Sequence, residues 1–165
     1  MNLVTALALV IGALGALATW LFLGPLAALG LSIWAAFIAW GSFYSAGGGE
    51  DGLKTAIVGA IWGALMATLA LVLVPIIGMG VVGTAVAVGL TVALMILGAH
   101  IPLLSGIPAS VYGYASTAAF ALMHAGANPT GTDITTSPLM NVVASMIIGA
   151  IFGYVSEKIT KSVAS

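Results

Sequence analysis

The residues best suited to bind a solute are hydroxyl side chains that follow two prolines. Pro102 and Pro108 bracket Ser105, and each proline removes a backbone N–H, so backbone groups are freed in this segment. Beyond Pro108, hydroxyl residues recur at positions i, i+4 and i+7 of a predicted helix and share one face: Ser110, Tyr114 and Thr117. This pattern predicts a hydroxyl-lined path for a small polar solute. The alternative is that serine and threonine bond carbonyls of their own helix, while Pro108 only begins it.

Further candidates lie on two other predicted helices. Asn141 and Ser145 are four residues apart and form a weakly polar stripe, which either lines the same path or joins helices through hydrogen bonds. Trp34, Phe37 and Tyr44 share an aromatic face, which predicts either a constriction or a surface against lipid or core. The pore-lining candidates are therefore Ser105, Pro108, Ser110, Tyr114, Thr117, Asn141 and Ser145.

The sequence offers no motif for catalysis, a cofactor or a metal. It contains no cysteine, and it lacks HExxH, GxSxG, a P-loop and a glycine-rich dinucleotide fingerprint. His100 and His124 flank one predicted helix and lie roughly 35 Å apart at 1.5 Å per residue, so they cannot share a metal within one subunit. An Asx turn explains Asp133. We expect no enzyme activity, no metal and no cofactor.

The elements that position these residues are defined by the distribution of charge. Only 4% of the residues are charged, against roughly 25% in a soluble domain, and they fall at 50–54, at Asp133 and at 157–161. The mean hydropathy is +1.26. So few charges cannot coat a soluble protein, so the lipid bilayer must solvate most of the surface. A net charge of −1 gives no electrostatic case for nucleic acid.

The uncharged blocks predict six transmembrane helices, because a helix needs about 20 apolar residues to cross a bilayer. Gly24-Pro25, the segment 75–80 and the polar loop 124–137 interrupt the blocks. We expect spans near 3–23, 27–45, 54–74, 80–98, 105–123 and 138–160. All three lysines then fall on one side, which predicts cytoplasmic N- and C-termini and an outer loop at 124–137.

A weak internal duplication predicts a 3+3 inverted repeat within a single domain. The segment 33–42 matches 107–116, and IVGAIWG at 57–63 matches IIGAIFG at 147–153 with five of seven residues identical. Units of about 1–77 and 78–160 would each hold three spans, and an odd number forces opposite orientations. Chance similarity between glycine-rich helices is the alternative.

Two of the matched segments carry glycine pairs at four-residue spacing. These are Gly59 with Gly63 and Gly149 with Gly153. Without a Cβ, glycine lets two helices approach closely, so the pairs predict helix packing within or between subunits.

The segment GIPASVYGYASTAAF at 106–120, the six short spans and the glycine-rich third and sixth helices resemble a known family. The chain is similar over nearly its whole length to bacterial inner-membrane proteins grouped as domain of unknown function 1097. The resemblance implies a bacterial inner membrane and transfers no functional residue.

These observations predict an all-α integral membrane protein that acts as a channel or facilitator for a small uncharged or weakly polar solute. The rival interpretation is a non-transporting scaffold or assembly subunit whose glycine faces dock other helices. A homo-oligomer is expected under either interpretation, and an intramembrane enzyme is disfavoured because reactive side chains are too few.

Overall fold

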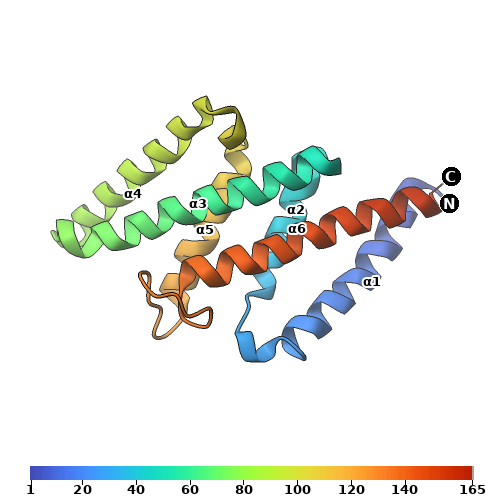
Figure 1. Ribbon diagram of the computed structural model, residues 1–165, viewed down its shortest axis with the longest axis horizontal. Coiled ribbons are helices and arrows are strands. Elements are labelled where there is room, and N and C mark those ends of the chain that lie inside the picture. The colour runs from blue at the N-terminus through green and yellow to red at the C-terminus, as the bar shows by residue number, and fades with distance from the viewer. Residues whose placement is uncertain (165) are drawn as a thin grey trace.

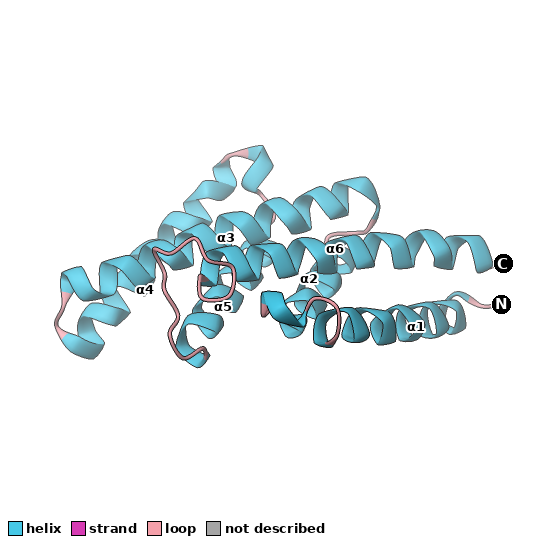
Figure 2. Ribbon diagram, turned by 60° about the horizontal axis from the view of Figure 1, so that its bottom comes forward, coloured by secondary structure: helices cyan, strands magenta, loops and turns pink. Residues whose placement is uncertain are grey.

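The protein is described by a computed structural model that places residues 1–164, and this stretch consists of helices joined by turns and loops (Figures 1 and 2). The α-helices are α1 (Leu3–Leu23), α2 (Ile33–Ser45), α3 (Gly49–Ile77), α4 (Gly80–Leu97), α5 (Ile107–Met123) and α6 (Pro138–Val163). Short 3-10 turns lie in two connections, at Ala27–Leu29, Gly98–His100 and Pro102–Leu104. No strand occurs within residues 1–164, which confirms the expected all-α class.

Two long helices, α3 and α6, form the centre and run side by side in opposite directions (Figure 1). α2 packs along α6, and α5 packs along α3, both behind the central pair in this view. α1 lies outside against α6, and α4 lies outside against α3. The N- and C-termini lie next to each other (Figure 1). Each short helix is therefore held by the long helix of the other half of the chain.

The helices differ in their ability to cross a membrane. Among residues 1–164, four are long and apolar enough: α1, α3, the stretch from α4 to His100, and α6. α2 has 13 residues and α5 has 17. At 1.5 Å per residue these are about 20 and 26 Å long, short of the roughly 30 Å of a hydrocarbon core. The two short helices are the ones that carry most of the candidate residues.

Local backbone geometry moves two predicted helix boundaries, and a third differs because α3 begins at Gly49 rather than near residue 54. α2 begins at Ile33 rather than near residue 27, because Ala27–Leu29 forms a 3-10 turn that Gly30 ends at a φ of 60°. The prediction that Pro75 ends the third helix is wrong, since α3 continues to Ile77. Pro75 removes one i→i−4 hydrogen bond, and the helix ends two residues later rather than at the proline itself. The turn that follows uses Gly78 and Gly80, both at positive φ.

Glycine permits the close approach of α3 and α5. A Cβ on Gly63 would overlap the backbone carbonyl of Ser110, and a Cβ on Gly59 would lie 2.5 Å from the Cβ of Ala109. These contacts lie within one subunit.

The contact between α6 and α2 has the same character. A Cβ on Gly149 would overlap the carbonyl of Ala36, and a Cβ on Gly153 would lie 2.8 Å from Cδ1 of Phe43. Backbone-to-backbone packing of this kind replaces the hydrophobic drive that lipid removes between helices.

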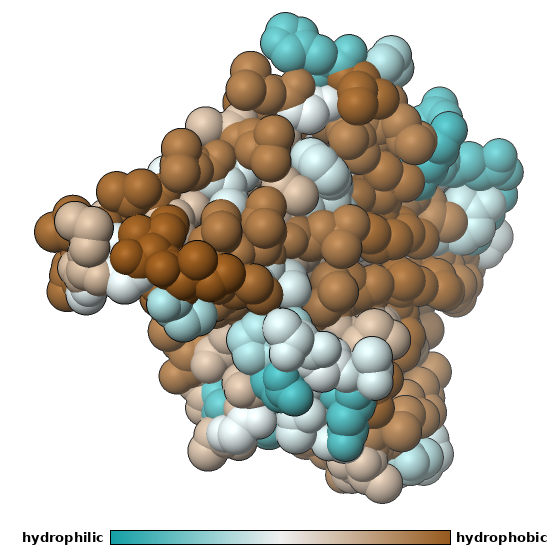
Figure 3. Space-filling view, turned by 60° about the vertical axis from the view of Figure 1, so that its left-hand side comes forward, coloured by the Kyte–Doolittle hydropathy of each residue, from teal (hydrophilic) through white to brown (hydrophobic). Residues whose placement is uncertain are grey.

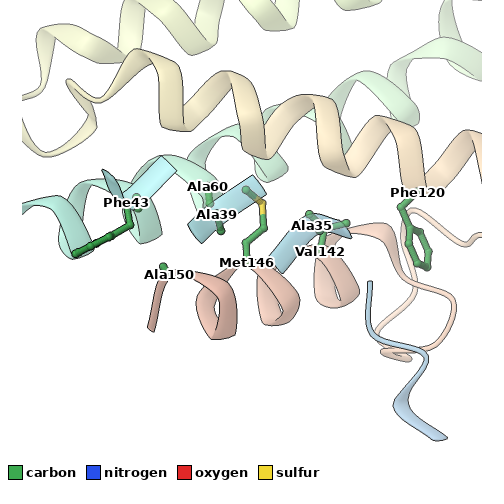
Figure 4. Packing of buried hydrophobic residues seen from close by; sticks show 9 residues of the cluster. Ala35, Ala39, Phe43, Ala60, Phe120, Val142, Met146 and Ala150 are labelled. Carbon is green, nitrogen blue, oxygen red and sulfur yellow. The ribbon is translucent and has the colours of Figure 1, made fainter. Parts of the chain in front are cut away.

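Apolar residues, most of them alanine, fill the space between the helices. The core cluster consists of Ala35, Ala39, Phe43, Ala56, Ala60, Phe120, Val142, Met146 and Ala150. Met146 reaches from α6 towards Ala39 and Ala60 (Figure 4). On the face shown in Figure 3 a broad apolar band separates hydrophilic patches above it from hydrophilic patches below it. The most apolar stretches of α1 and α4 are only 17% and 22% buried, as expected where lipid is the solvent.

The charged clusters near residue 50 and at the C-terminus meet at one end of the molecule. The N–H of Gly49, which starts α3, donates to Oε2 of Glu157 at 2.8 Å. Lys161 pairs with Oε1 of the same carboxylate at 2.6 Å. We call this region, with residues 50–54 and 157–161, the charged end.

Candidate functional site

A small cavity lies where α2 ends and α5 begins. Its volume is about 140 Å³, and we name it the Ser42 cavity. Its lining consists of Ser42, Ser45, Ala46, Thr55, Gly106, Pro108 and Ala109. The lining carries hydroxyls, small side chains and the first turn of α5, with no charged side chain among these residues.

A second cavity lies at the opposite end of the same two helices, where α2 begins and α5 ends. Its volume is about 300 Å³, and we name it the Trp34 cavity. Its lining consists of Gly30, Leu31, Ser32, Ile33, Trp34, Phe120, Met123 and His124. The His124 ring stacks on Phe120 with ring centres 4.7 Å apart, so the wall is aromatic on the α5 side.

The two cavities use corresponding positions of α2 and α5. Trp34 of α2 lines one cavity, and Pro108, which stands 74 residues later in α5, lines the other. Ala46 of α2 lines the Ser42 cavity, and Phe120, which stands 74 residues later in α5, lines the Trp34 cavity. The offset equals that of the matched segments 33–42 and 107–116.

A charged vestibule adjoins the Ser42 cavity. It has a volume of about 480 Å³ and is lined by Asp51, Lys54, Thr55, Pro102, Leu103 and Ser105. Thr55 lines both spaces, so the small cavity lies next to the water-exposed charged end. A solute arriving from that end would meet one acidic and one basic side chain before the uncharged cavity.

Three buried hydroxyls of α2 and α5 have no hydrogen-bond partner within residues 1–164. They are Ser42, Ser116 and Thr117, each exposed by no more than 2%. Buried polar groups are normally paired, and each exception calls for a reason. Ser42 and Ser116 were absent from the predicted pore-lining set. The available signal was the repeat, because these serines end the two matched segments.

The predicted pore residues at and before the start of α5 have three different surroundings. Ser105 is exposed, lines the vestibule, and donates to the carbonyl of Pro102 at 2.8 Å. Pro108 lines the Ser42 cavity. Ser110 is buried in the α3–α5 contact, where its hydroxyl donates to the carbonyl of Gly106 at 3.3 Å.

The other two hydroxyls of the predicted stripe differ in their hydrogen bonding. The Thr91 hydroxyl of α4 lies within hydrogen-bond distance of the carbonyl of Ala87, at 2.9 Å. It also lies 2.9 Å from the Tyr114 hydroxyl, so the Tyr114 side chain ties α5 to α4. Thr117 is fully buried and unpaired. The stripe is continuous along α5, but its members do not share one cavity.

Asn141 and Ser145 join α6 to the connection before α2. The amide of Asn141 donates to the carbonyls of Gly30 and Ile134, both at 2.9 Å. Its Oδ1 accepts from the Ser32 hydroxyl at 2.8 Å, while the Ser145 hydroxyl accepts from the N–H of Ser32 at 2.9 Å. These bonds favour the interpretation that the pair joins helices. We call this set the Asn141 clamp.

The three aromatic candidates of α2 have separate surroundings. Trp34 lines its cavity and is 38% exposed. Phe37 is exposed and stacks on Trp40 with ring centres 5.8 Å apart. Tyr44 lies 2.8 Å from the hydroxyl of Ser156, which also accepts from the Trp40 indole at 3.0 Å.

The described residues contain no group of three or more His, Asp or Glu side chains that could hold a metal ion. His124 closes α5, whereas His100 lies in the turn before it. In the loop between α5 and α6, the N–H and the hydroxyl of Thr135 both donate to Asp133 and lower the pKa of its carboxyl. The expected Asx turn is confirmed by the first of these bonds.

Six helices with exposed apolar faces, small-residue contacts and water-exposed charges at one end define a helical membrane protein. A family model described as a protein of unknown function, DUF1097, matches residues 8–161, so the chain belongs to this family. This match confirms the resemblance seen in the sequence. No curated protein and no solved structure matched the chain.

Proposed function

We propose that this chain is a membrane channel or facilitator that carries a small uncharged or weakly polar solute between α2 and α5. The observation that carries the proposal is the pair of cavities at opposite ends of these two helices. Their linings have no Asp, Glu, Lys or Arg, so neither is suited to hold an ion stripped of water.

The segment between the cavities is short and closed. Trp34 and Ser42 lie eight residues apart in α2, which is about 12 Å along the helix. The core residues Ala39 and Met146 are at most 1% exposed and fill the interior beside this segment. Passage therefore requires α2 and α5 to separate at one end and then at the other, so a facilitator with alternating openings fits better than a permanently open pore.

Helix pairing supports a 3+3 inverted repeat as the basis of this movement. A two-fold relation between the halves would exchange α2 with α5 and α3 with α6. If α2 packs on α6, this relation requires that α5 packs on α3, and both contacts are present. In repeat-built transporters, one unit moves against the other around a site at their interface.

The same proposal includes six spans, with α2 and α5 as short, tilted crossings supported by protein on both sides. It places the charged end in the cytoplasm of a bacterial inner membrane, because all three lysines lie at or near that end. It also includes a homo-oligomer, which would cover part of the exposed apolar surface of α1 and α4.

The test measures solute flux into proteoliposomes that contain the purified full-length protein. Light scattering reports the flux, and acetamide, urea and glycerol are the solutes used as probes. Ala46→Leu places a larger side chain in the lining of the Ser42 cavity and fills part of it. We expect this variant to lower flux towards the rate of protein-free liposomes. Gly89→Leu is the matched control, because nothing lies within 4 Å of a Cβ at Gly89. Equal flux with and without the wild-type protein would reject the proposal.

The second candidate function is a non-transporting scaffold, and the exposed apolar faces of α1 and α4 are the observation that favours it. A scaffold would copurify with a different membrane protein in fixed stoichiometry and would give no flux by itself.

A further inference from the structure

We propose that the Ser42 cavity is a binding subsite for a small neutral solute with a hydrogen-bond acceptor, such as the carbonyl of a simple amide. In this subsite the Ser42 hydroxyl and the first turn of α5 are the donors. The inference rests on the proposed function for its physiological meaning, but binding itself can be measured without transport.

The Ser42 hydroxyl departs from the usual behaviour of hydroxyls in this protein. Thr68, Thr91 and Ser145 each donate to the carbonyl four residues earlier in their own helix, at 2.8–2.9 Å. Ser42 makes no such bond and has no other partner within the described chain, although it is only 1% exposed. Its own carbonyl is already used by Ser45 and Ala46. A buried hydroxyl left in this state gains a full hydrogen bond when a ligand supplies the acceptor.

The start of α5 supplies the second donor group. Gly106, Pro108 and Ala109 all line the cavity, and the helix that starts there has 17 residues. At this end the N–H of Ile107 already donates to Ser105, that of Ser110 donates to Gly106, and Pro108 has no N–H. The N–H groups of Gly106 and Ala109 therefore remain as donors, and the helix N-terminus carries partial positive charge. No side chain caps this helix end. An acceptor oxygen in the cavity would therefore receive hydrogen bonds from α2 on one side and from the N-terminus of α5 on the other.

Size and charge restrict the solute. At roughly 30 Å³ per water molecule, a cavity of about 140 Å³ holds the equivalent of four to five waters, which suits a solute of few heavy atoms. An ion would lose its hydration without gaining a counter-charge from this lining. Asp51 and Lys54 stand outside in the vestibule, where their opposite charges select against neither sign.

Ser116 provides a matched control for Ser42. It occupies the corresponding position in α5, is 2% exposed, and also lacks a hydrogen-bond partner among residues 1–164. It is not one of the residues that line the Ser42 cavity. Replacing either serine with alanine removes an unpaired hydroxyl, so both variants should fold alike.

The first experiment measures binding of acetamide to the purified full-length protein in nanodiscs by ligand-observed nuclear magnetic resonance. Ser42→Ala should weaken the affinity roughly 3- to 10-fold, the value of one hydrogen bond, whereas Ser116→Ala should leave it unchanged. Acetate and ethylammonium, of similar size but charged, should bind more weakly than acetamide. Equal affinity of wild type and Ser42→Ala, or equal loss in both alanine variants, would overturn the inference.

The second experiment uses the absence of cysteine from the sequence. In Ser42→Cys, a small methanethiosulfonate reagent should label the single thiol, and acetamide should slow the reaction. A thiol that is not labelled, or is labelled at the same rate with acetamide present, contradicts a solute site at this position.

These outcomes separate the subsite from the transport function. Ser42-dependent binding of acetamide without flux in proteoliposomes would retain the subsite and reject transport. Flux together with binding that is insensitive to Ser42 would retain transport and reject the subsite.

Discussion

At the scale of single residues, most buried polar side chains hold the fold together rather than face a solute. Asn141 is the clearest case, since it is fully buried and all of its bonds go to the protein. It joins α6 to the α1–α2 connection and to the loop before α6. The contrasting group is equally buried but unpaired within residues 1–164, and it consists of Ser42, Ser116, Thr117 and Thr160. Bonding state, rather than residue type, separates the structural groups from the unpaired hydroxyls, and of the unpaired hydroxyls Ser42 lines the Ser42 cavity.

Asn141→Ala should lower the free energy of unfolding by about 2–4 kcal/mol, because it leaves several buried partners without a hydrogen bond. The measurement is unfolding of the purified protein in mixed micelles, titrated with a denaturing detergent. Asn128→Ala is the control, since the side chain of Asn128 is exposed and accepts a single bond from Thr130 at 3.2 Å. A loss for Asn141→Ala no larger than for Asn128→Ala would show that the Asn141 clamp does not stabilise the fold.

At the scale of elements, the short helices α5 and α2 pack closely against the long helices α3 and α6, respectively. This packing depends on glycines of α3 and α6 that let the helix backbones approach closely, because a side chain at these positions has no space. α2 and α5 are the two shortest α-helices among residues 1–164, and the two cavities lie at their ends.

Gly63→Ala and Gly149→Ala should each destabilise the protein by about 1–3 kcal/mol, since the added methyl group overlaps a backbone carbonyl of the neighbouring helix. Gly89→Ala should instead be neutral or stabilising by up to about 1 kcal/mol, because alanine favours the helix and no atom lies within 4 Å.

The same detergent-unfolding measurement compares the three variants. If Gly63→Ala were as stable as Gly89→Ala, the close contact between α3 and α5 would not be a source of stability. A similar result for Gly149→Ala would remove that role from the α2–α6 contact.

At the scale of the whole molecule, the arrangement of charge and apolar surface gives the protein two different ends. The charged end joins the start of α3 to the end of α6 through Gly49, Glu157 and Lys161. The loop between α5 and α6 carries Asp133 and several threonines. A broad apolar surface lies between hydrophilic regions (Figure 3). This separation is what a bilayer would require.

The proposed orientation can be tested with single cysteines in this cysteine-free chain. A membrane-impermeant maleimide should label Thr132→Cys in intact bacterial cells, because Thr132 is exposed in the α5–α6 loop. Ser162→Cys, at the exposed end of α6, should react only after the inner membrane is permeabilised. The reverse labelling pattern would place the lysines outside, and labelling of both in intact cells would contradict an odd number of crossings between them.

The sequence by itself determined the class of protein, the all-helical fold and most helix boundaries. These follow from local physics: long uncharged runs must be helical in lipid, and glycine or proline interrupts them. The family could also be recognised from a local motif. Boundaries failed where one backbone conformation decided them, as at Gly30 and Pro75.

The tertiary structure alone decided which polar groups are satisfied. Periodicity placed Ser110, Tyr114 and Thr117 on one face of α5. In the structure Ser110 packs against α3, Tyr114 bonds to α4, and Thr117 lies in the interior. Sequence spacing fixes the direction of a side chain but not what lies opposite it. Ser42 could not be separated from paired serines until the neighbouring helices were in place, because an unpaired hydroxyl is defined by partners distant in the chain.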